Sequence, residues 1–151
     1  MDFSQITVDL YIGTTPGTKD YHELREKGVG LVINMRVERR PYPDRVGEPM
    51  ETVWLPTFDS PLVPIPIGAL QRGVEKALAA IERGDKVYVH CAQGVHRGVA
   101  MGAAILIAQG YSADEAMDLI AARRPAADPR AWYIQRRIRR FAESWKDGRL
   151  D

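Results

Sequence analysis

The residues with the clearest chemical potential lie in one short segment, residues 90–98, with the sequence His-Cys-Ala-Gln-Gly-Val-His-Arg-Gly. It holds the only cysteine of the chain, Cys91, and Arg97 follows after five intervening residues. An apolar stretch precedes it and a run rich in Ala and Gly follows, which indicates a strand, a loop and then a helix. Such a loop gathers backbone N–H groups at a helix N-terminus, where they bind anions and favour a thiolate. A guanidinium adds a planar fork that matches two phosphate oxygens. The segment therefore predicts nucleophilic chemistry on a phosphate-like group.

This segment resembles the phosphate-binding loop of the cysteine-dependent phosphatases of the dual specificity type. Their loop reads His-Cys, two residues, Gly, two residues, Arg, and His90, Cys91, Gly94 and Arg97 match it. Cysteine and arginine at this spacing mean little alone, but the expected strand and helix around them strengthen the match. A buried structural cysteine is the alternative, and it leaves Arg97 without a role. The resemblance implies a phosphate-binding loop formed by Ala92, Gln93, Gly94, Val95, His96, Arg97 and Gly98.

A second segment of chemical interest lies 32 residues before the cysteine, where Asp59 stands in the sequence Thr-Phe-Asp-Ser-Pro. When phosphate leaves an ester oxygen, that oxygen must gain a proton, and a carboxylic acid over the site can supply it. Members of the family carry an aspartate in a similar context. The three prolines of residues 61–66 predict a rigid extended loop able to carry Asp59. The alternative is that Asp59 only forms a turn or cap. Weaker candidates for the acid are Asp44, Glu48 and Glu51.

The resemblance implies a two-step hydrolysis of a phosphate monoester. Cys91 attacks phosphorus while Asp59 protonates the leaving oxygen, and water then cleaves the phosphocysteine with Asp59 as base. Arg97 and the amides of residues 92–98 stabilise the charge on the equatorial oxygens. Neither a metal nor another cofactor is expected, because this mechanism needs none.

The three histidines of the chain do not predict a metal site, because His22 is distant and His90 and His96 flank the nucleophile. In the family, the histidine at position 90 orients the loop through hydrogen bonds and helps keep the cysteine ionised. An ordinary core histidine at a strand end is the alternative. His96 is less constrained, and it either lines the rim of the pocket or faces solvent.

Position 98 departs from the family pattern, which usually has Ser or Thr after the arginine. Gly98 has no hydroxyl to support the departing thiolate. We therefore expect a phosphoenzyme that hydrolyses slowly relative to its formation, unless water, His96 or another group takes over. The departure leaves a phosphate-binding module with weak turnover as an alternative, although a pure binder needs neither Cys91 nor Asp59. A rhodanese-like sulfurtransferase is a further alternative, against which the Cys-to-Arg spacing argues.

The substrate class is indicated only by the side chains of the loop. Ala92, Gln93 and Val95 are neutral, whereas family members that select polyphosphorylated inositol lipids tend to carry lysines there. We therefore expect a protein phosphorylated on tyrosine, or on serine and threonine. Phosphoinositides, nucleotides, RNA 5′ phosphates and other small phosphate esters are the alternatives, and a phosphate or sulfate ion is expected to fit the loop.

Composition limits these interpretations. With 151 residues, 45% of them hydrophobic, the chain is long enough for one domain with a substantial core, so one catalytic domain over residues 1–151 is expected. A net charge of +1 argues against a protein built for nucleic acid or a membrane surface. A single cysteine excludes an internal disulfide and suits a reducing compartment. Neither a signal peptide nor an apolar stretch long enough for a membrane span is visible, so a cytoplasmic protein is expected.

Hydrophobic patterns predict an α/β fold, a single domain with a mostly parallel sheet of four or five strands flanked by helices. Strands are expected over 6–12, 31–33, 53–55 and 86–90, the third stopped by Pro56. Helices are expected over 18–27, from 67 to just before Gly84, over 99–109, from the Ser112 capping box to just before Pro125, and after Asp128-Pro129.

Arginines gather in the last expected helix, away from its apolar face. The simplest interpretation is a solvated surface, and the alternative is a role in binding a phosphoprotein or other anionic partner. The same choice applies to Arg39 and Arg40, for which a solvated loop is favoured over substrate steering. The helical arginines are Arg136, Arg137, Arg139 and Arg140, and the apolar face consists of Ile134, Ile138, Phe141 and Trp145.

Overall fold

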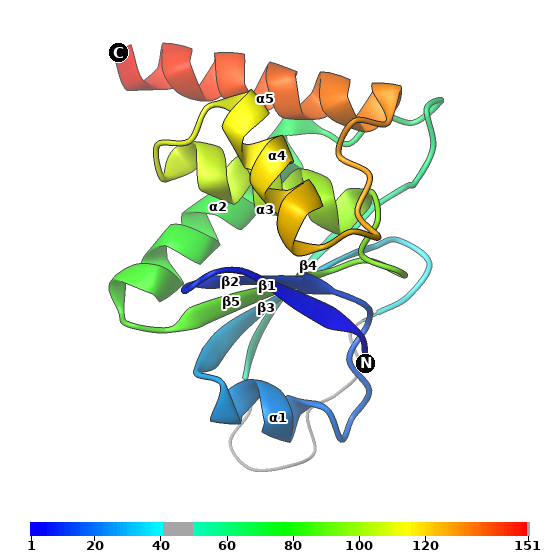
Figure 1. Ribbon diagram of the computed structural model, residues 1–151, viewed down its shortest axis with the longest axis vertical. Helices are drawn as coiled ribbons and strands as arrows, with labels where there is room; N and C mark the ends of the chain where they lie inside the picture. Colours follow the sequence, from blue (N-terminus) through cyan, green and yellow to red (C-terminus); the bar gives the residue numbers. More distant parts are fainter. Residues whose placement is uncertain (41–49, 151) are drawn as a thin grey trace.

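The computed structural model describes residues 1–40 and 50–150, and the weaker acid candidates Asp44 and Glu48 lie outside this part of the chain. One sheet carries helix α1 on one face and helices α2 to α5 on the other (Figure 1). The strands are β1 (Phe3–Thr7), β2 (Leu10–Gly13), β3 (Val29–Arg36), β4 (Glu51–Thr57) and β5 (Lys86–His90). The helices are α1 (Tyr21–Glu26), α2 (Ile67–Glu82), α3 (Arg97–Ala108), α4 (Ala113–Arg123) and α5 (Trp132–Leu150).

The strands form a five-stranded sheet in the order β1-β2-β5-β3-β4. Strands β2, β5, β3 and β4 are parallel to one another, and only the edge strand β1 runs antiparallel to its neighbour. The predicted α/β class with a mostly parallel sheet is confirmed. Loops that follow parallel strands meet at the carboxyl edge of the sheet, which is where open α/β sheets bind ligands.

The two elements that flank the predicted phosphate-binding loop are both buried. Strand β5 lies in the middle of the sheet, and its residues 87–90 are buried. Helix α3 is buried at every position from Arg97 to Ile107, which confirms the prediction of a helix covered on all sides. Gly102 allows the close approach of α3 to the sheet, because a Cβ there would collide with the side chain of Ile12. The loop is therefore held at both ends by the core.

Two details of the strand prediction are wrong. Residues 6–12 do not form one alternating strand but parts of a hairpin, because Val8 lies in the turn between β1 and β2 with 68% of its surface exposed. Pro56 does not stop the third predicted strand, since β4 continues to Thr57. The β3–β4 register shifts at this point, and an irregular stretch of an edge strand tolerates a proline without losing a ladder bond.

The later helices follow their sequence signals closely. At the start of α4, Ser112 Oγ accepts a hydrogen bond from the Glu115 N–H at 3.1 Å, and Glu115 Oε1 accepts one from the Ser112 N–H at 2.9 Å. This confirms the predicted capping box. Helix α5 buries Ile134, Ile138 and Phe141, as its apolar stripe predicted. In the described part of the chain, no helix combines the length and the apolar character that a membrane span requires.

Candidate active site

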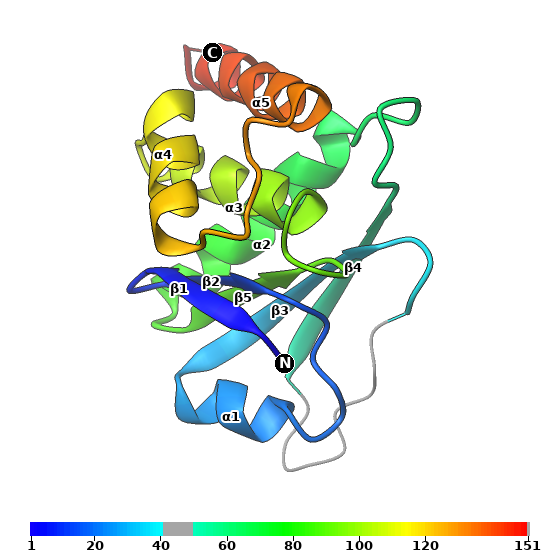
Figure 2. The same cartoon turned by 45° about the vertical axis from the view of Figure 1, so that its right-hand side comes forward.

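The predicted phosphate-binding loop connects the end of β5 to the start of α3, at the carboxyl edge of the sheet (Figure 2). Cys91 is the first residue after β5 and is only 3% exposed, and Arg97 is the first residue of α3. A pocket of about 260 Å³ opens above them. The structure thus brings the three predicted catalytic residues together, because this pocket is lined by Asp59, Cys91, Ala92, Gln93, Val95, His96 and Arg97.

Arg97 is fixed by a carboxylate that the sequence did not single out. Its Nη1 and Nη2 donate to Glu38 Oε1 and Oε2 at 2.7 and 2.9 Å, and Nη1 also donates to the Thr57 carbonyl at 2.9 Å. Burial lowers the pKa of Arg97, but the hydrogen bonds to Glu38 and the negative charge of the Cys91 thiolate form outweigh it and hold that pKa above its ordinary value. The Nε–H of Arg97 is a buried donor that finds no acceptor among the described residues. The guanidinium is therefore charged and oriented, and two of its five N–H groups, the Nε–H and one Nη2–H, take no part in these hydrogen bonds.

Glu38 is placed by hydrogen bonds of Asn34, a residue at the end of β3. The side chain of Asn34 accepts a hydrogen bond from the Arg36 N–H at 2.8 Å and donates one to the Arg39 carbonyl at 3.1 Å, which folds residues 34–39 back on themselves. The hydrogen bonds from Arg97 are the first cause that lowers the pKa of Glu38 to about 2. A buried arginine needs a carboxylate partner, but nothing local indicated that Glu38 was the one.

Asp59 is held at the rim of the pocket by two side chains from other parts of the chain. Tyr133 Oη donates to Asp59 Oδ1 at 2.7 Å, and His96 Nδ1 lies 3.1 Å from Asp59 Oδ2. The Tyr133 hydroxyl also lies 3.3 Å from His96 Nδ1, so the three groups form a closed cluster. Burial raises the pKa of Asp59, but the hydrogen bonds from Tyr133 and His96 outweigh it and keep that pKa below its usual 3.8. This arrangement stabilises the carboxylate form of Asp59.

Comparison with known proteins decides the family of the chain. The model for the family described as dual specificity phosphatase, catalytic domain, matches residues 10–141. The chain belongs to this family. Dual specificity protein phosphatase 14 of Mus musculus is 28% identical over 136 residues, which cover 89% of this chain and 67% of that protein. The crystal structure of human DUSP28 has a TM-score of 0.84 at 22% identity and covers 95% of each chain. A crystal structure of PTPMT1 in complex with PI(5)P has a TM-score of 0.81 at 25% identity and covers 97% of each chain.

Family membership makes the chain a cysteine-dependent phosphatase, which confirms the resemblance read from residues 90–97. It also removes the sulfurtransferase alternative. The roles of individual residues rest on the geometry, because the comparisons assign none of them to this phosphatase.

The loop of this phosphatase is shaped by a buried arginine that the sequence analysis missed. Arg124 is 2% exposed, and its guanidinium donates to the carbonyls of Gln93 and Gly94 at 2.9 and 3.0 Å. Gly94 has a φ of 66°, and a Cβ there would lie 2.9 Å from both Arg124 and the Gly13 carbonyl. Arg124 thereby fixes two peptide groups of the loop. No signal marked it, since its neighbours Arg123 and Pro125 fit an ordinary helix end.

His90 lies beneath the loop rather than in the pocket. It is 1% exposed, and its Nδ1 lies 3.4 Å from the Cys91 carbonyl, to which Thr15 Oγ1 also donates at 3.1 Å. Burial lowers the pKa of His90 to about 4, so the imidazole is neutral near pH 7. Any support that His90 gives to the thiolate therefore comes from hydrogen bonding and packing instead of a full charge.

Gly98 faces the nucleophile from the first turn of α3. A Cβ at this position would lie 3.5 Å from Cys91 Sγ and 3.4 Å from the Cys91 backbone nitrogen, which are ordinary van der Waals distances. The site therefore has room for the serine that the family pattern usually places here. The departure is a loss of a hydroxyl group and is not forced by crowding.

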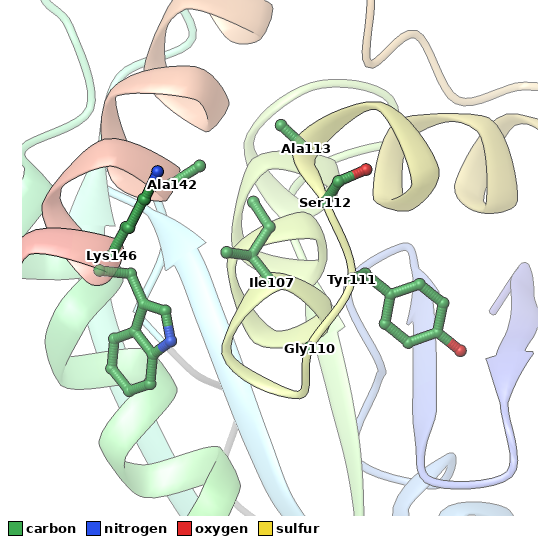
Figure 3. Close-up of a pocket in the computed structure, with 8 residues that line it drawn as sticks. Ile107, Gly110, Tyr111, Ser112, Ala113, Ala142 and Lys146 are labelled. Atoms are coloured by element: carbon green, nitrogen blue, oxygen red, sulfur yellow. The ribbon is translucent and has the colours of Figure 1, made fainter. Parts of the chain in front are cut away.

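Other polar clusters and hollows do not compete with this site. Within residues 1–40 and 50–150, no three His, Cys, Asp or Glu side chains are grouped as metal ligands. A wider hollow of about 480 Å³ lies between the end of α3 and the helices α4 and α5 (Figure 3). Its lining contains none of the phosphate-binding loop: Ile107, Gly110, Tyr111, Ser112, Ala113, Ala142, Trp145 and Lys146. It is largely apolar, and the hydroxyl of Ser112 in its lining caps α4 by accepting a hydrogen bond from the Glu115 N–H.

Proposed function

We propose that this phosphatase removes phosphate from phosphotyrosine or phosphoserine/threonine residues of proteins, through a phosphocysteine intermediate. The observation that carries the proposal is the convergence of Cys91, Arg97 and Asp59 on one pocket of about 260 Å³. The unpartnered Nε–H of Arg97 adds support, because a buried donor left without a partner is costly and a phosphate oxygen would satisfy it. The site keeps a nucleophile (Cys91), an arginine that can bind the phosphate oxygens (Arg97) and an acid (Asp59). This combination favours turnover over a pure phosphate-binding role.

In the first step, Cys91 Sγ forms a bond to phosphorus and the ester P–O bond breaks. Arg97 and the N–H groups of the loop hold the three equatorial oxygens as charge redistributes. The leaving oxygen takes its proton from Asp59, which must therefore be protonated before this step. The hydrogen bonds from Tyr133 and His96 oppose that state, so the first step is favoured at acidic pH.

In the second step, water attacks phosphorus, Asp59 accepts its proton, and the S–P bond breaks to release the thiolate of Cys91. Here the carboxylate form is the one required, and the hydrogen bonds from Tyr133 and His96 supply it. Because Gly98 offers no hydroxyl to the departing thiolate, we propose that this step is slow relative to the first.

The phosphoprotein assignment rests on the neutral side chains of the loop. Ala92, Gln93 and Val95 line the pocket without adding positive charge for a second phosphate close to the first. Phosphoinositides form the second candidate class, since a crystal structure of PTPMT1, 25% identical to this chain, contains PI(5)P. The two candidate substrate classes, phosphoproteins and phosphoinositides, differ in where further negative charge lies relative to the phosphate that is removed. An experiment can therefore separate them.

The test is turnover of an aryl phosphate by wild type, Cys91→Ser and Asp59→Asn, followed by phosphopeptides and PI(5)P micelles at equal phosphate concentration. Cys91→Ser is expected to lose all measurable turnover, and Asp59→Asn to lose about 10²- to 10⁴-fold on phosphotyrosine peptides. Asp128→Asn is the matched control, because its carboxylate lies 3.8 Å from His96 Nε2 without a contact to Asp59. Wild-type turnover by Cys91→Ser would refute the mechanism. A higher kcat/KM on PI(5)P than on every phosphopeptide would transfer the assignment to the second candidate.

A further inference from the structure

A small hollow of about 120 Å³ lies beside the active site, next to the acid loop, which we define as residues 58–66. Figure 2 shows this loop, between β4 and α2, next to the start of α5. The hollow combines two prolines of the acid loop with two aromatic and two basic side chains of α5: Pro61, Pro64, Trp132, Tyr133, Arg136 and Arg137. None of these residues except Tyr133 takes part in the chemistry described above.

The two arginines of this hollow differ from their neighbours. Arg130 and Arg139 contact Asp114, and Arg140 lies 3.6 Å from Glu143. Arg136 and Arg137, in contrast, contact no carboxylate of the described residues. The simple interpretation of the helical arginines as one solvated surface is thus incomplete, because two of them hold uncompensated charge beside a hollow.

Arg137 is anchored so that its charge stays at the hollow. Its Nε donates to the Ile65 carbonyl of the acid loop at 2.9 Å, which leaves the outer nitrogens of the guanidinium available. Burial, together with the charges of Arg140 and Arg136, lowers the pKa of Arg137. These are the surroundings of a cation that gains from an anionic partner.

The hollow is continuous with the active site through one side chain. Tyr133 lines the hollow, and its hydroxyl donates to Asp59, which lines the catalytic pocket. Trp132, 59% exposed, adds an apolar surface at the edge. A substrate whose phosphate lies on the loop can therefore extend over Tyr133 and reach the arginines. With about 30 Å³ for one water molecule, a hollow of about 120 Å³ holds a carboxylate or a phosphate group.

We propose that the hollow is a second anion-binding subsite, in which Arg136 and Arg137 bind an acidic group on the same phosphoprotein, close to the residue being dephosphorylated. This proposal rests on the proposed phosphoprotein function. The shared chemistry is an anionic side chain, which is either Glu or Asp or a second phosphorylated residue. Trp132 and the two prolines would contact the peptide between the two anionic groups.

The test compares three phosphotyrosine peptides that are identical except for the flanking residues, which are glutamate, glutamine or a second phosphorylated residue. Each is assayed with wild type, Arg136→Gln, the double variant with Arg137→Gln, and the control Arg139→Gln. The control removes the same charge from α5 at a residue that faces Asp114. Turnover of an aryl phosphate and the melting temperature show whether the double variant keeps its fold and its basal chemistry.

Wild type is expected to prefer the glutamate or bisphosphorylated peptide over the glutamine peptide through a lower KM. Arg136→Gln should reduce that preference about two- to fivefold, which is the range for one exposed ion pair. The double variant should abolish it, while Arg139→Gln and the aryl phosphate rate stay unchanged.

Equal kcat/KM values of wild type on glutamate and glutamine peptides would overturn the subsite while leaving the proposed function intact. If Arg139→Gln lost the preference for the acidic peptides to the same extent, the subsite would be overturned as well. The overall positive charge of α5 would then explain the preference. If Arg136→Gln affected PI(5)P micelles and not the acidic peptides, the occupant would be a lipid headgroup and the peptide proposal would be wrong. Absence of wild-type turnover on every substrate would instead refute the proposed function.

Discussion

Gly98→Ser restores the hydroxyl that the family pattern usually has next to the catalytic arginine, and it tests the slow second step directly. The new Cβ would lie 3.5 Å from Cys91 Sγ, so the serine hydroxyl can point at the sulfur without displacing backbone. During the second step the sulfur regains negative charge as the S–P bond breaks. A hydroxyl placed there donates a hydrogen bond to that charge and lowers the barrier.

The expected size follows from the energy of one hydrogen bond to a charged group. Such a bond contributes about 1.5–3 kcal/mol, and about 1.4 kcal/mol corresponds to a tenfold change in rate. Breakdown of the phosphoenzyme should therefore become about 10- to 100-fold faster in Gly98→Ser. The matched control is Gly98→Ala, which adds the same Cβ without a hydroxyl. Alanine also favours the helix over glycine by about 1 kcal/mol.

Rapid-mixing kinetics with an aryl phosphate separates the two steps. Wild type and Gly98→Ala are expected to release a burst of phenol equal to the enzyme concentration, followed by a slow steady rate. Gly98→Ser should show a higher steady rate and a reduced burst. If wild type gave no burst and no trapped phosphoenzyme, the slow second step would be refuted. Equal acceleration by Ser and Ala would show that packing is responsible and the hydroxyl is not.

Three further variants test the groups that position the catalytic residues. Tyr133→Phe removes a hydrogen bond that lowers the pKa of Asp59, so the pKa of Asp59 should rise. The alkaline limb of the kcat/KM profile should then move to higher pH. If that limb did not move, Tyr133 would not tune the acid. Glu38→Gln should cost about 1–2 kcal/mol of unfolding free energy at pH 7, a value below that of a fully buried pair because the Glu38 side chain is 45% exposed. Since the pKa of Glu38 falls from 4.5 to about 2 on folding, its contribution is present above pH 4.5 and lost as pH falls to about 2, so urea unfolding should find a smaller acid-induced decline in the variant over that window. Arg124→Lys keeps the positive charge but loses the planar guanidinium that donates to the loop carbonyls. With an aryl phosphate, kcat should fall about tenfold or more while KM changes little. An unchanged kcat would show that the loop keeps its shape without Arg124.

What the sequence predicted well is what depends on neighbours along the chain. The loop motif, the buried strand before it and the apolar helix after it are contiguous, so their order alone places Cys91 and Arg97 correctly. The spacing of Asp59 from the cysteine singled it out, and the structure places it in the lining of the same pocket, while its role as the acid stays a prediction. The capping box of α4 is likewise complete within Ser112 to Glu115.

The residues that sequence reasoning missed act over long separations. Glu38 meets Arg97 across 59 positions, and Tyr133 meets Asp59 across 74. Arg124 reaches the carbonyl of Gly94 across 30. Each pairing arises because the carboxyl edge of the sheet gathers loops from distant segments, and no local pattern records which arginine will be buried there or which group will bind it. The chain is rich in both, so composition could not single them out.

The geometry around Asp59 and the glycine at position 98 act on different steps, and together they determine how the burst depends on pH. The hydrogen bonds from Tyr133 and His96 lower the pKa of Asp59, and in the proposed mechanism this limits the first step at neutral pH. In the same mechanism the second step is limited by the lack of a hydroxyl group at Gly98, and a missing hydroxyl does not depend on pH. Lowering the pH should therefore accelerate phosphoenzyme formation more than its breakdown. With an aryl phosphate whose leaving group needs a proton, the burst phase should therefore become faster as the pH falls, while its amplitude stays at one phenol per enzyme. A burst phase that became slower at lower pH would refute this reasoning.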